Sequence, residues 1–215
     1  WSSDVCSSDL VLLNGSRYTV DAVEQVVIVG SSLAGLRAAE SLRTGGYGGV
    51  ITMVGAERHL PYDRPPLSKR YLSGEWEVDN IALRKPEALA SLDLTFRLGS
   101  AAQKLDTAGR SLALADGSTL PYDGLVIATG ASCRRVPAQP PWEGVHELRT
   151  LDDAVSLRNA IRVRRPDGAP RRVVVIGAGF IGLEAAATAR STYGCEVTVL
   201  EGLPVPLVRA LGPDM

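Results

Sequence analysis

Two glycine-rich turns, each between an apolar run and a helical pattern, constrain this chain more than any other feature. The first run, Val26–Val29, leads into Gly30-Ser31-Ser32-Leu33-Ala34-Gly35. The second run, Val173–Ile176, leads into Gly177-Ala178-Gly179-Phe180-Ile181-Gly182. A parallel strand, a tight turn and a helix form the start of a Rossmann unit, where backbone N–H groups and the helix N-terminus hold a pyrophosphate. The sequence therefore predicts an α/β fold with two Rossmann-like dinucleotide-binding units.

The two turns differ at the second glycine, which lets the backbone approach the pyrophosphate closely. Gly179 occupies that position in the second turn, and Ser32 occupies it in the first. Serine is small and adds a hydroxyl, so binding is not excluded. One such turn is also found in ordinary α/β domains. Two turns, each followed by an apolar strand that ends near a glutamate, predict two bound dinucleotides, with FAD and NAD(H) as the obvious pair.

Composition excludes several classes of function. The 23 Lys and Arg residues are balanced by 24 Asp and Glu residues, so nothing favours binding to nucleic acid or to an anionic membrane. The apolar runs are far shorter than the roughly 20 residues of a membrane span, and no secretion signal is evident. Cys6, Cys133 and Cys195 are widely spaced and form no metal-binding pattern. We therefore expect no metal site and a cytoplasmic location.

The two ends of the chain do not fit a complete domain pattern. Residues 1–10 are polar, lack an initiator Met, and resemble either a translated sequencing adaptor or a disordered tail. Near the other end, a β-α-β stretch covers about residues 172–200, whereas a mononucleotide-binding half needs βαβαβ. The second unit is therefore predicted to be truncated, with its strands partly uncovered. The chain alone is expected to bind FAD poorly and to have little activity.

Periodicity and turn residues predict the elements between these ends. Residues 11–24 have no regular pattern. Helices are expected at Leu33–Arg43, near Pro66, and at Pro86–Leu92 and Asp152–Arg162. Strands are expected at Val26–Val29, Val50–Val54, 81–84, 94–98, Ser111–Ala115, Thr119–Leu120 and Leu125–Ala128.

Four motifs in a fixed order carry a family resemblance. They are Pro61-Tyr62-Asp63-Arg64-Pro65-Pro66-Leu67-Ser68-Lys69, Ala128-Thr129-Gly130, Leu148-Arg149-Thr150-Leu151-Asp152-Asp153 and Gly177-Ala178-Gly179-Phe180-Ile181-Gly182-Leu183-Glu184. Over residues 25–215 the chain resembles the N-terminal half of FAD-dependent pyridine-nucleotide oxidoreductases. More narrowly, it resembles ferredoxin reductases of the putidaredoxin and rhodocoxin reductase type. The resemblance implies an FAD domain at 25–150, a linker helix and basic loop at 151–170, and an incomplete NAD domain at 171–215.

The resemblance implies an FAD site. Arg64 suits the pyrophosphate because a guanidinium matches phosphate geometry, and Lys69 is expected beside the isoalloxazine N5. Glu57 follows the second strand and can accept hydrogen bonds from ribose hydroxyls, but Ala56 stands where some relatives carry the acidic residue, so this assignment stays open. The expected FAD contacts are Gly30, Ser32, Gly35, Glu57, Arg64, Lys69, Ala102, Ala128, Thr129, Gly130 and Arg149.

The second unit is expected to bind NAD(H). A carboxylate at the end of its second strand, Glu201, accepts a bond from the ribose 2′-hydroxyl and repels a 2′-phosphate, which favours NADH over NADPH. The resemblance implies that Glu184 pairs with Lys69 across the domain boundary, and these two are the expected catalytic residues. The expected NAD contacts are Gly177, Gly179, Gly182, Glu184 and Glu201.

The implied activity is hydride transfer from NADH to flavin N5, followed by single-electron transfer to a 2Fe-2S ferredoxin or Rieske-type acceptor. A disulfide reductase needs a redox cysteine near the flavin, and residues 58–75 contain none. An NADH oxidase, a nitrite-reductase flavin subunit and an apoptosis-inducing-factor-like protein share the scaffold and remain open. A non-catalytic dinucleotide-binding module is the alternative of a different class.

Overall fold

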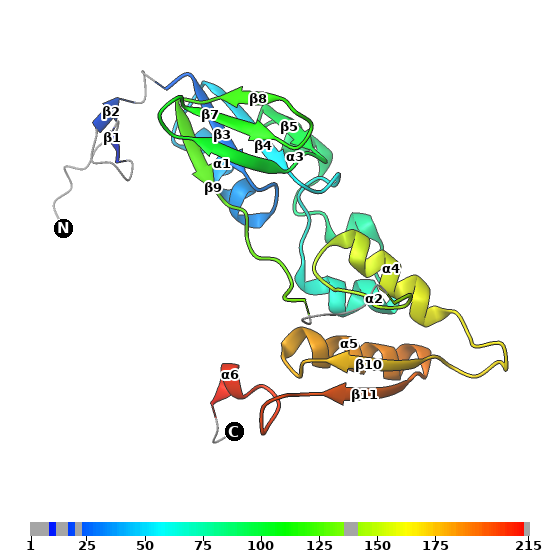
Figure 1. The fold of residues 1–215 in the computed structure, drawn as a ribbon. Helices are drawn as coiled ribbons and strands as arrows, with labels where there is room; N and C mark the ends of the chain where they lie inside the picture. The colour runs from blue at the N-terminus through cyan, green and yellow to red at the C-terminus, as the bar shows by residue number, and fades with distance from the viewer. Residues whose placement is uncertain (1–8, 12–16, 20–22, 136–141, 213–215) are drawn as a thin grey trace. The chain divides into compact units, whose positions relative to one another are not determined.

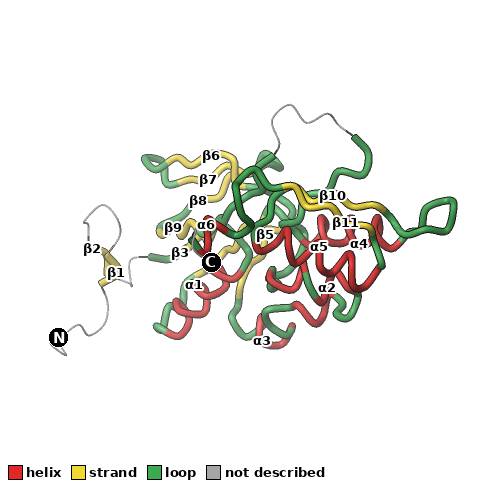
Figure 2. The backbone as a smooth tube through the Cα atoms, turned by 90° about the horizontal axis from the view of Figure 1, so that it is seen from below, coloured by secondary structure: helices red, strands yellow, loops and turns green. Residues whose placement is uncertain are grey.

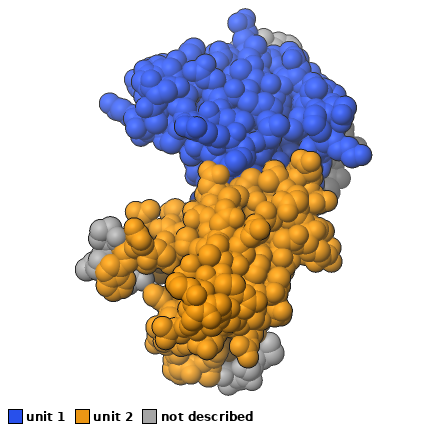
Figure 3. Space-filling model, turned by 90° about the vertical axis from the view of Figure 1, so that its right-hand side faces the viewer, with its two compact units in different colours: residues 1–62, 83–130 blue, residues 63–82, 131–215 orange. Residues whose placement is uncertain are grey.

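A computed structural model describes residues 9–11, 17–19, 23–135 and 142–212 (Figure 1). The chain divides into two compact units, each built from two segments (Figure 3). The first contains Trp1–Tyr62 and Leu83–Gly130, and the second contains Asp63–Ala82 and Ala131–Met215. Most of the predicted tail, residues 1–10, lies outside the described residues. The functional division into FAD and NAD domains stays a prediction, since the compactness of a unit does not show which ligand it binds.

A four-stranded parallel sheet forms the centre of the first unit. Its strand order is β5 (Leu94–Leu98), β4 (Val50–Gly55), β3 (Gln25–Val29) and β9 (Gly124–Ile127). In β3, Val26 to Val29 are all buried. Such unbroken apolar runs are typical of parallel strands covered on both faces.

Each face of β3 packs against a different layer. Val26 and Ile28 contact Leu36 on α1 (Leu33–Thr44) in a cluster that also includes Leu89 of α3 (Pro86–Ala90). Val27 and Val29 pack against β7 (Ser111–Leu114), the middle strand of an antiparallel sheet with β6 (Ala102–Asp106) and β8 (Thr119–Pro121). Figure 2 shows α1 and the β6–β8 sheet on opposite sides of β3. The sheet therefore holds the ends of β3 and β4 rigidly.

The sequence predictions fail at three short segments. The strand predicted at 81–84 is wrong: Ile81 ends the 3₁₀ helix η3 (Val78–Ile81), which reciprocal capping bonds between Glu77 and Asn80 stabilise, and only Ala82 forms a single β-bridge. Strand β6 was not predicted, because its sequence lacks the β-branched residues typical of strands and it forms by pairing with β7. Arg17–Thr19 (β2), expected to be irregular, pairs antiparallel with Asp9–Val11 (β1).

The second unit contains the second β-α-β stretch. Strand β10 (Arg172–Ile176) pairs in parallel with β11 (Glu196–Leu200), and α5 (Phe180–Tyr193) connects them. Helices α2, α4 and α5 lie on one side of this strand pair (Figure 2). The remaining elements of this unit are η2 (Pro65–Ser68), α2 (Arg70–Ser73), η3, α4 (Leu151–Arg162) and α6 (Val208–Leu211).

The other face of this strand pair is open to solvent. Val174 and Ile176 are 60% and 69% exposed, and Leu200 is 51% exposed. Val173 and Val197 pack toward Ile161 and Ala189 in a small apolar cluster. The prediction that these strands are only partly covered is confirmed for the face that points away from α5.

Candidate functional site

The first glycine turn has a geometry that only glycine permits at two positions. Gly30 has φ +120°, in the left-handed region, and its N–H donates to the Val54 carbonyl at 2.8 Å. A Cβ added to Gly35 would lie 1.9 Å from the Gly30 carbonyl oxygen, so helix α1 can pack this closely only without a side chain there. Ser32 is the N-cap of α1 and makes no side-chain capping bond.

The second glycine turn repeats this arrangement. Gly177 has φ +103°, and its N–H donates to the Leu200 carbonyl at 2.8 Å. A Cβ added to Gly182 would lie 2.1 Å from the Gly177 oxygen. Gly179 is the N-cap of α5, and a Cβ there would meet no atom within 4 Å, which leaves open space beside the backbone. Both turns therefore have the form that accepts a pyrophosphate at a helix N-terminus.

The close approach at Gly35 gives a stability prediction. We expect Gly35→Ala to lower the free energy of unfolding by about 2–3 kcal/mol, because the methyl group must displace backbone atoms. Gly48→Ala is the matched control, since its Cβ would enter open space. Chemical denaturation of both variants checks this. Equal stability of the two variants would contradict the packing described for α1.

The turn after β9 lies directly against the first glycine turn. The Ala128 N–H donates to the Val29 carbonyl at 2.7 Å, and a Cβ added to Gly30 would lie 2.1 Å from the Ala128 oxygen. Gly130, two residues later, has φ +69°. The structure therefore brings the predicted Ala128-Thr129-Gly130 motif to the carboxyl end of β3. Ala102, at the start of β6, is half-buried and packs against the apolar cluster that contains Val29 and Val54, whose carbonyls accept the bonds from Ala128 and Gly30. Its contact with FAD stays a prediction.

The two units differ at the end of their second strand. Val54 and Leu200 each accept a bond from the first glycine of their turn, so Gly55 is equivalent to Glu201. A Cβ at Gly55 would lie 2.0 Å from the Ser31 Oγ and 2.9 Å from the Ser31 Cβ, so a side chain there would require Ser31 to move. This crowding favours a later residue as the acid of the first unit.

Glu57 supplies the first carboxylate after that position. The buried Tyr62 hydroxyl donates a hydrogen bond to Glu57 Oε2 and so fixes one carboxylate oxygen. Ala56 offers only its backbone. This geometry favours Glu57 in the alternative that the sequence leaves open, and its contact with FAD stays a prediction.

Glu201 directly follows β11 and contacts the second glycine turn. Its Oε2 accepts a hydrogen bond from the Ala178 N–H at 2.7 Å, and its Oε1 accepts one from the Leu203 N–H at 3.0 Å. Two backbone donors therefore fix the orientation of the carboxylate. A carboxylate has about four acceptor sites, so these bonds are compatible with a further bond from a ribose hydroxyl.

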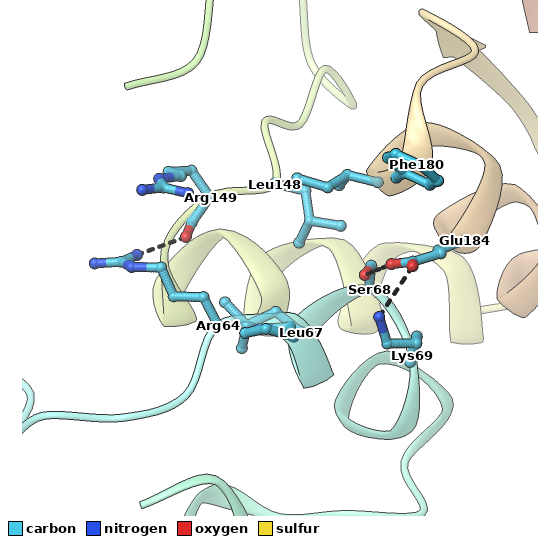
Figure 4. A pocket seen from close by; sticks show the side chains of 10 residues that line it. Arg64, Leu67, Ser68, Lys69, Leu148, Arg149, Phe180 and Glu184 are labelled. Carbon is cyan, nitrogen blue, oxygen red and sulfur yellow. Dashed lines mark hydrogen bonds and ion pairs between the residues drawn. The ribbon is translucent and has the colours of Figure 1, made fainter. Parts of the chain in front are cut away.

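A pocket of about 270 Å³ lies within the second unit (Figure 4). Half of its lining is apolar, and the polar half carries three cationic side chains and one carboxylate. This composition suits a planar ligand with an anionic part. The lining residues are Arg64, Pro65, Leu67, Ser68, Lys69, Leu148, Arg149, Phe180, Ile181 and Glu184.

The predicted pair of Lys69 and Glu184 is present in this pocket. Lys69 Nζ lies 3.0 Å from Glu184 Oε1, and the Ser68 hydroxyl donates to Glu184 Oε2 at 2.5 Å (Figure 4). Both residues belong to the same compact unit, although they were expected to meet across a domain boundary. Burial raises the pKa of Glu184, but the bonds from Ser68 and Lys69 outweigh it and hold the pKa below its usual value. Their catalytic role stays a prediction.

Two arginines are fixed at the other side of the pocket. The Arg64 guanidinium donates to the Arg149 carbonyl at 2.6 Å, and Arg149 Nε donates to the Ala131 carbonyl at 2.8 Å. In Figure 4 the two guanidinium groups lie near one another, away from Glu184. These carbonyl bonds fix the positions of both guanidinium groups, whose planar fork of donors matches the geometry of a phosphate.

Sequence reasoning missed the apolar lining of this pocket. Phe180 is 55% exposed and lies between two glycines of the second turn, and Ile181 beside it is 50% exposed. Leu148 joins them from the segment before α4. The sequence did contain a signal for this lining, because Phe180 and Ile181 are large apolar residues inside a glycine turn that is expected to face solvent.

Comparison with known proteins identifies the family. Residues 24–215 match the family described as pyridine nucleotide-disulphide oxidoreductase. The chain belongs to this family. It is 42% identical over 191 residues to rhodocoxin reductase of Rhodococcus erythropolis, with 88% of this chain and 43% of the relative covered. It is 37% identical over 200 residues to putidaredoxin reductase of Pseudomonas putida, with 91% and 46% covered.

Solved structures agree with the fold. The covalent putidaredoxin reductase–putidaredoxin complex matches with a TM-score of 0.76 and 36% identity, covering 86% of this chain and 44% of that one. The ferredoxin reductase for the CYP199A2 system of Rhodopseudomonas palustris matches with a TM-score of 0.79 and 39% identity, covering 89% and 46%. The predicted α/β fold with Rossmann-like units is confirmed. The chain spans slightly less than half the length of these relatives.

Two absences hold for the part of the chain that the structure describes. No group of three or more His, Cys, Asp or Glu side chains there is arranged to hold a metal ion. No helix within the described ranges is long and apolar enough to cross a membrane.

Proposed function

We propose that this chain is the FAD- and NADH-binding part of a cytoplasmic flavoprotein reductase that passes electrons to a 2Fe-2S ferredoxin. We propose that this ferredoxin passes the electrons on to a cytochrome P450 or to a ring-hydroxylating dioxygenase. The Lys69–Glu184 pair carries this proposal, because it lies in a pocket beside the N-terminus of α5, at the second glycine turn. The names of the similar proteins, which include ferredoxin reductases of both kinds of system, support it.

The residues of the chain fit FAD and a nicotinamide dinucleotide. Gly30 and Gly35 allow a tight turn in which any Cβ would collide with backbone atoms, and Gly179 leaves the open space that a pyrophosphate needs. Arg64 and Arg149 supply guanidinium groups for an anionic ligand. When bound, FAD supplies a two-electron acceptor that can release its electrons one at a time.

The protein groups contribute orientation and electrostatics. The Glu184 carboxylate holds the Lys69 ammonium in a fixed direction at 3.0 Å. A preorganised cation stabilises negative charge that develops nearby, and it does so more strongly where water is excluded. The apolar side chains of Leu148, Phe180 and Ile181 supply surface that a stacked ring system can cover.

The cysteines favour an electron-transfer role over disulfide reduction. Residues 58–75 contain no cysteine, so the segment that includes Lys69 supplies no redox pair. Cys195 is fully buried, and burial raises the pKa of its thiol, which disfavours the reactive thiolate. These observations favour transfer of electrons to an external acceptor over disulfide reduction.

The test is anaerobic titration with NADH of the FAD-loaded full-length reductase to which we propose this chain belongs, called the FAD-loaded protein below. We expect loss of the oxidised flavin spectrum, followed by cytochrome c reduction that depends on an added 2Fe-2S ferredoxin. Omission of the ferredoxin and replacement by a small disulfide are the controls. Disulfide reduction at a comparable rate, or oxygen consumption that exceeds electron transfer to ferredoxin, would assign the protein to another activity.

A further inference from the structure

Ser68 forms a hydrogen bond with Glu184 through its side chain. It is the last residue of η2 and is 3% exposed. Its hydroxyl donates to Glu184 Oε2 at 2.5 Å, while Lys69 takes the other carboxylate oxygen. A buried hydroxyl that donates to a carboxylate stabilises the charged form. Ser68 and Lys69, which are adjacent in sequence, therefore each bind one oxygen of the Glu184 carboxylate.

The backbone of Ser68 is held by the same helix. Thr188 Oγ1 donates to the Ser68 carbonyl at 2.9 Å. Glu184 and Thr188 are four residues apart on α5, so they lie on one face, one turn apart. Ser68 is thus attached to that face at two points, by its side chain and by its carbonyl. This attachment at two points fixes the backbone position of the next residue, Lys69.

The Lys69–Glu184 pair would be loose without this attachment. The side chains of Lys69 and Glu184 are 48% and 32% exposed, and an exposed ion pair holds its geometry weakly. With Oε2 fixed by Ser68, the plane of the carboxylate is set and Oε1 points at Lys69 Nζ (Figure 4). The fixed geometry of the Lys69–Glu184 ion pair therefore depends on the buried, neutral hydroxyl of Ser68.

We propose that Ser68 is a positioning residue, which with Thr188 fixes the carboxylate plane of Glu184 and so directs Lys69 in the pocket. This inference rests on the proposed function for its catalytic consequence, and on the geometry alone for its effect on Glu184. The other charged groups that line the pocket are Arg64 and Arg149, so Glu184 is its one acidic group among the described residues.

Measurement of the Glu184 titration tests the geometry without any cofactor. Carbon-13 NMR of the glutamate-labelled chain gives the side-chain pKa, with the signal assigned by its loss in Glu184→Gln. The Ser68 bond lowers the pKa of Glu184, so Ser68→Ala is expected to raise it, and Thr188→Val to raise it less. Ser73→Ala is the control, because that hydroxyl bonds to a local carbonyl outside the pocket. An unchanged Glu184 pKa in folded Ser68→Ala would overturn the proposal.

Flavin reduction tests the catalytic consequence in the FAD-loaded protein. Loss of a hydrogen bond to a charged group predicts about a tenfold lower limiting rate for Ser68→Ala, with the NADH concentration at half-rate little changed. The acid limb of the pH profile should move to higher pH, since Glu184 protonates earlier on acidification. Ser68→Thr, which keeps the hydroxyl, should restore the rate. A raised Glu184 pKa with an unchanged rate would reject the positioning role, whereas absence of reduction in the unmodified protein would reject the proposed function instead.

Discussion

Replacing Lys69 by methionine is expected to slow NADH-dependent reduction of the bound flavin by about a hundredfold, while FAD remains bound. Loss of one preorganised group that stabilises developing charge has this order of effect. Methionine keeps much of the apolar stem, so packing near Leu67 and Phe180 changes little. Lys69 forms an ion pair with Glu184 and its side chain is 48% exposed, so the cation has no role in the apolar core.

Stopped-flow absorbance with excess NADH measures this effect directly. Lys104→Met is the matched control, because Lys104 is an exposed residue of β6 and lies outside the pocket. We expect the control to reduce its flavin at the original rate. If Lys69→Met also does so, the electrostatic role of Lys69 is wrong, and if it loses FAD, Lys69 serves binding instead.

The fold was predictable where local signals and tertiary context agree. The apolar runs of β3 and β10 and the glycines that follow them predicted both β-α-β stretches, because backbone sterics at Gly30 and Gly177 leave little choice of residue. The strand expected at 81–84 is reduced to a single β-bridge at Ala82, because the 3₁₀ helix capped by Glu77 and Asn80 extends to Ile81. Strand β6 depends on pairing with β7, a tertiary effect that local sequence does not carry.

The charged residues of the candidate site were predictable from the sequence, but the residues that position them were not. The resemblance implied that Lys69 and Glu184 pair, and the structure contains that pair. The roles of Ser68 and Thr188 depend on how η2 lies against α5, across more than a hundred residues of sequence. Spacing along the chain has no information on such a contact. The same holds for the steric crowding at Gly55, which only the position of Ser31 reveals.

Coenzyme preference is the second large effect that we expect, and it depends on Glu201. The carboxylate is fixed by the Ala178 and Leu203 N–H groups at the end of β11, where a dinucleotide ribose meets the strand in a Rossmann unit. A ribose 2′-hydroxyl can donate to it, which favours NADH. A 2′-phosphate would place like charges together, although solvent at this exposed position weakens their repulsion.

Glu201→Gln is therefore expected to shift the ratio of kcat/KM for NADH over NADPH by about a hundredfold toward NADPH, from loss of a charge-assisted bond and of the repulsion together. The amide oxygen of glutamine can still accept the bond from the Ala178 N–H, which holds the glycine turn, while the bond from the Leu203 N–H is lost. Glu196→Gln removes an exposed carboxylate at the opposite end of the same strand and should leave the ratio unchanged. Steady-state kinetics with both coenzymes on the FAD-loaded protein measures the shift. Should the unmodified protein already prefer NADPH, the role given to Glu201 is wrong, because a fixed carboxylate beside the ribose cannot favour a phosphate there.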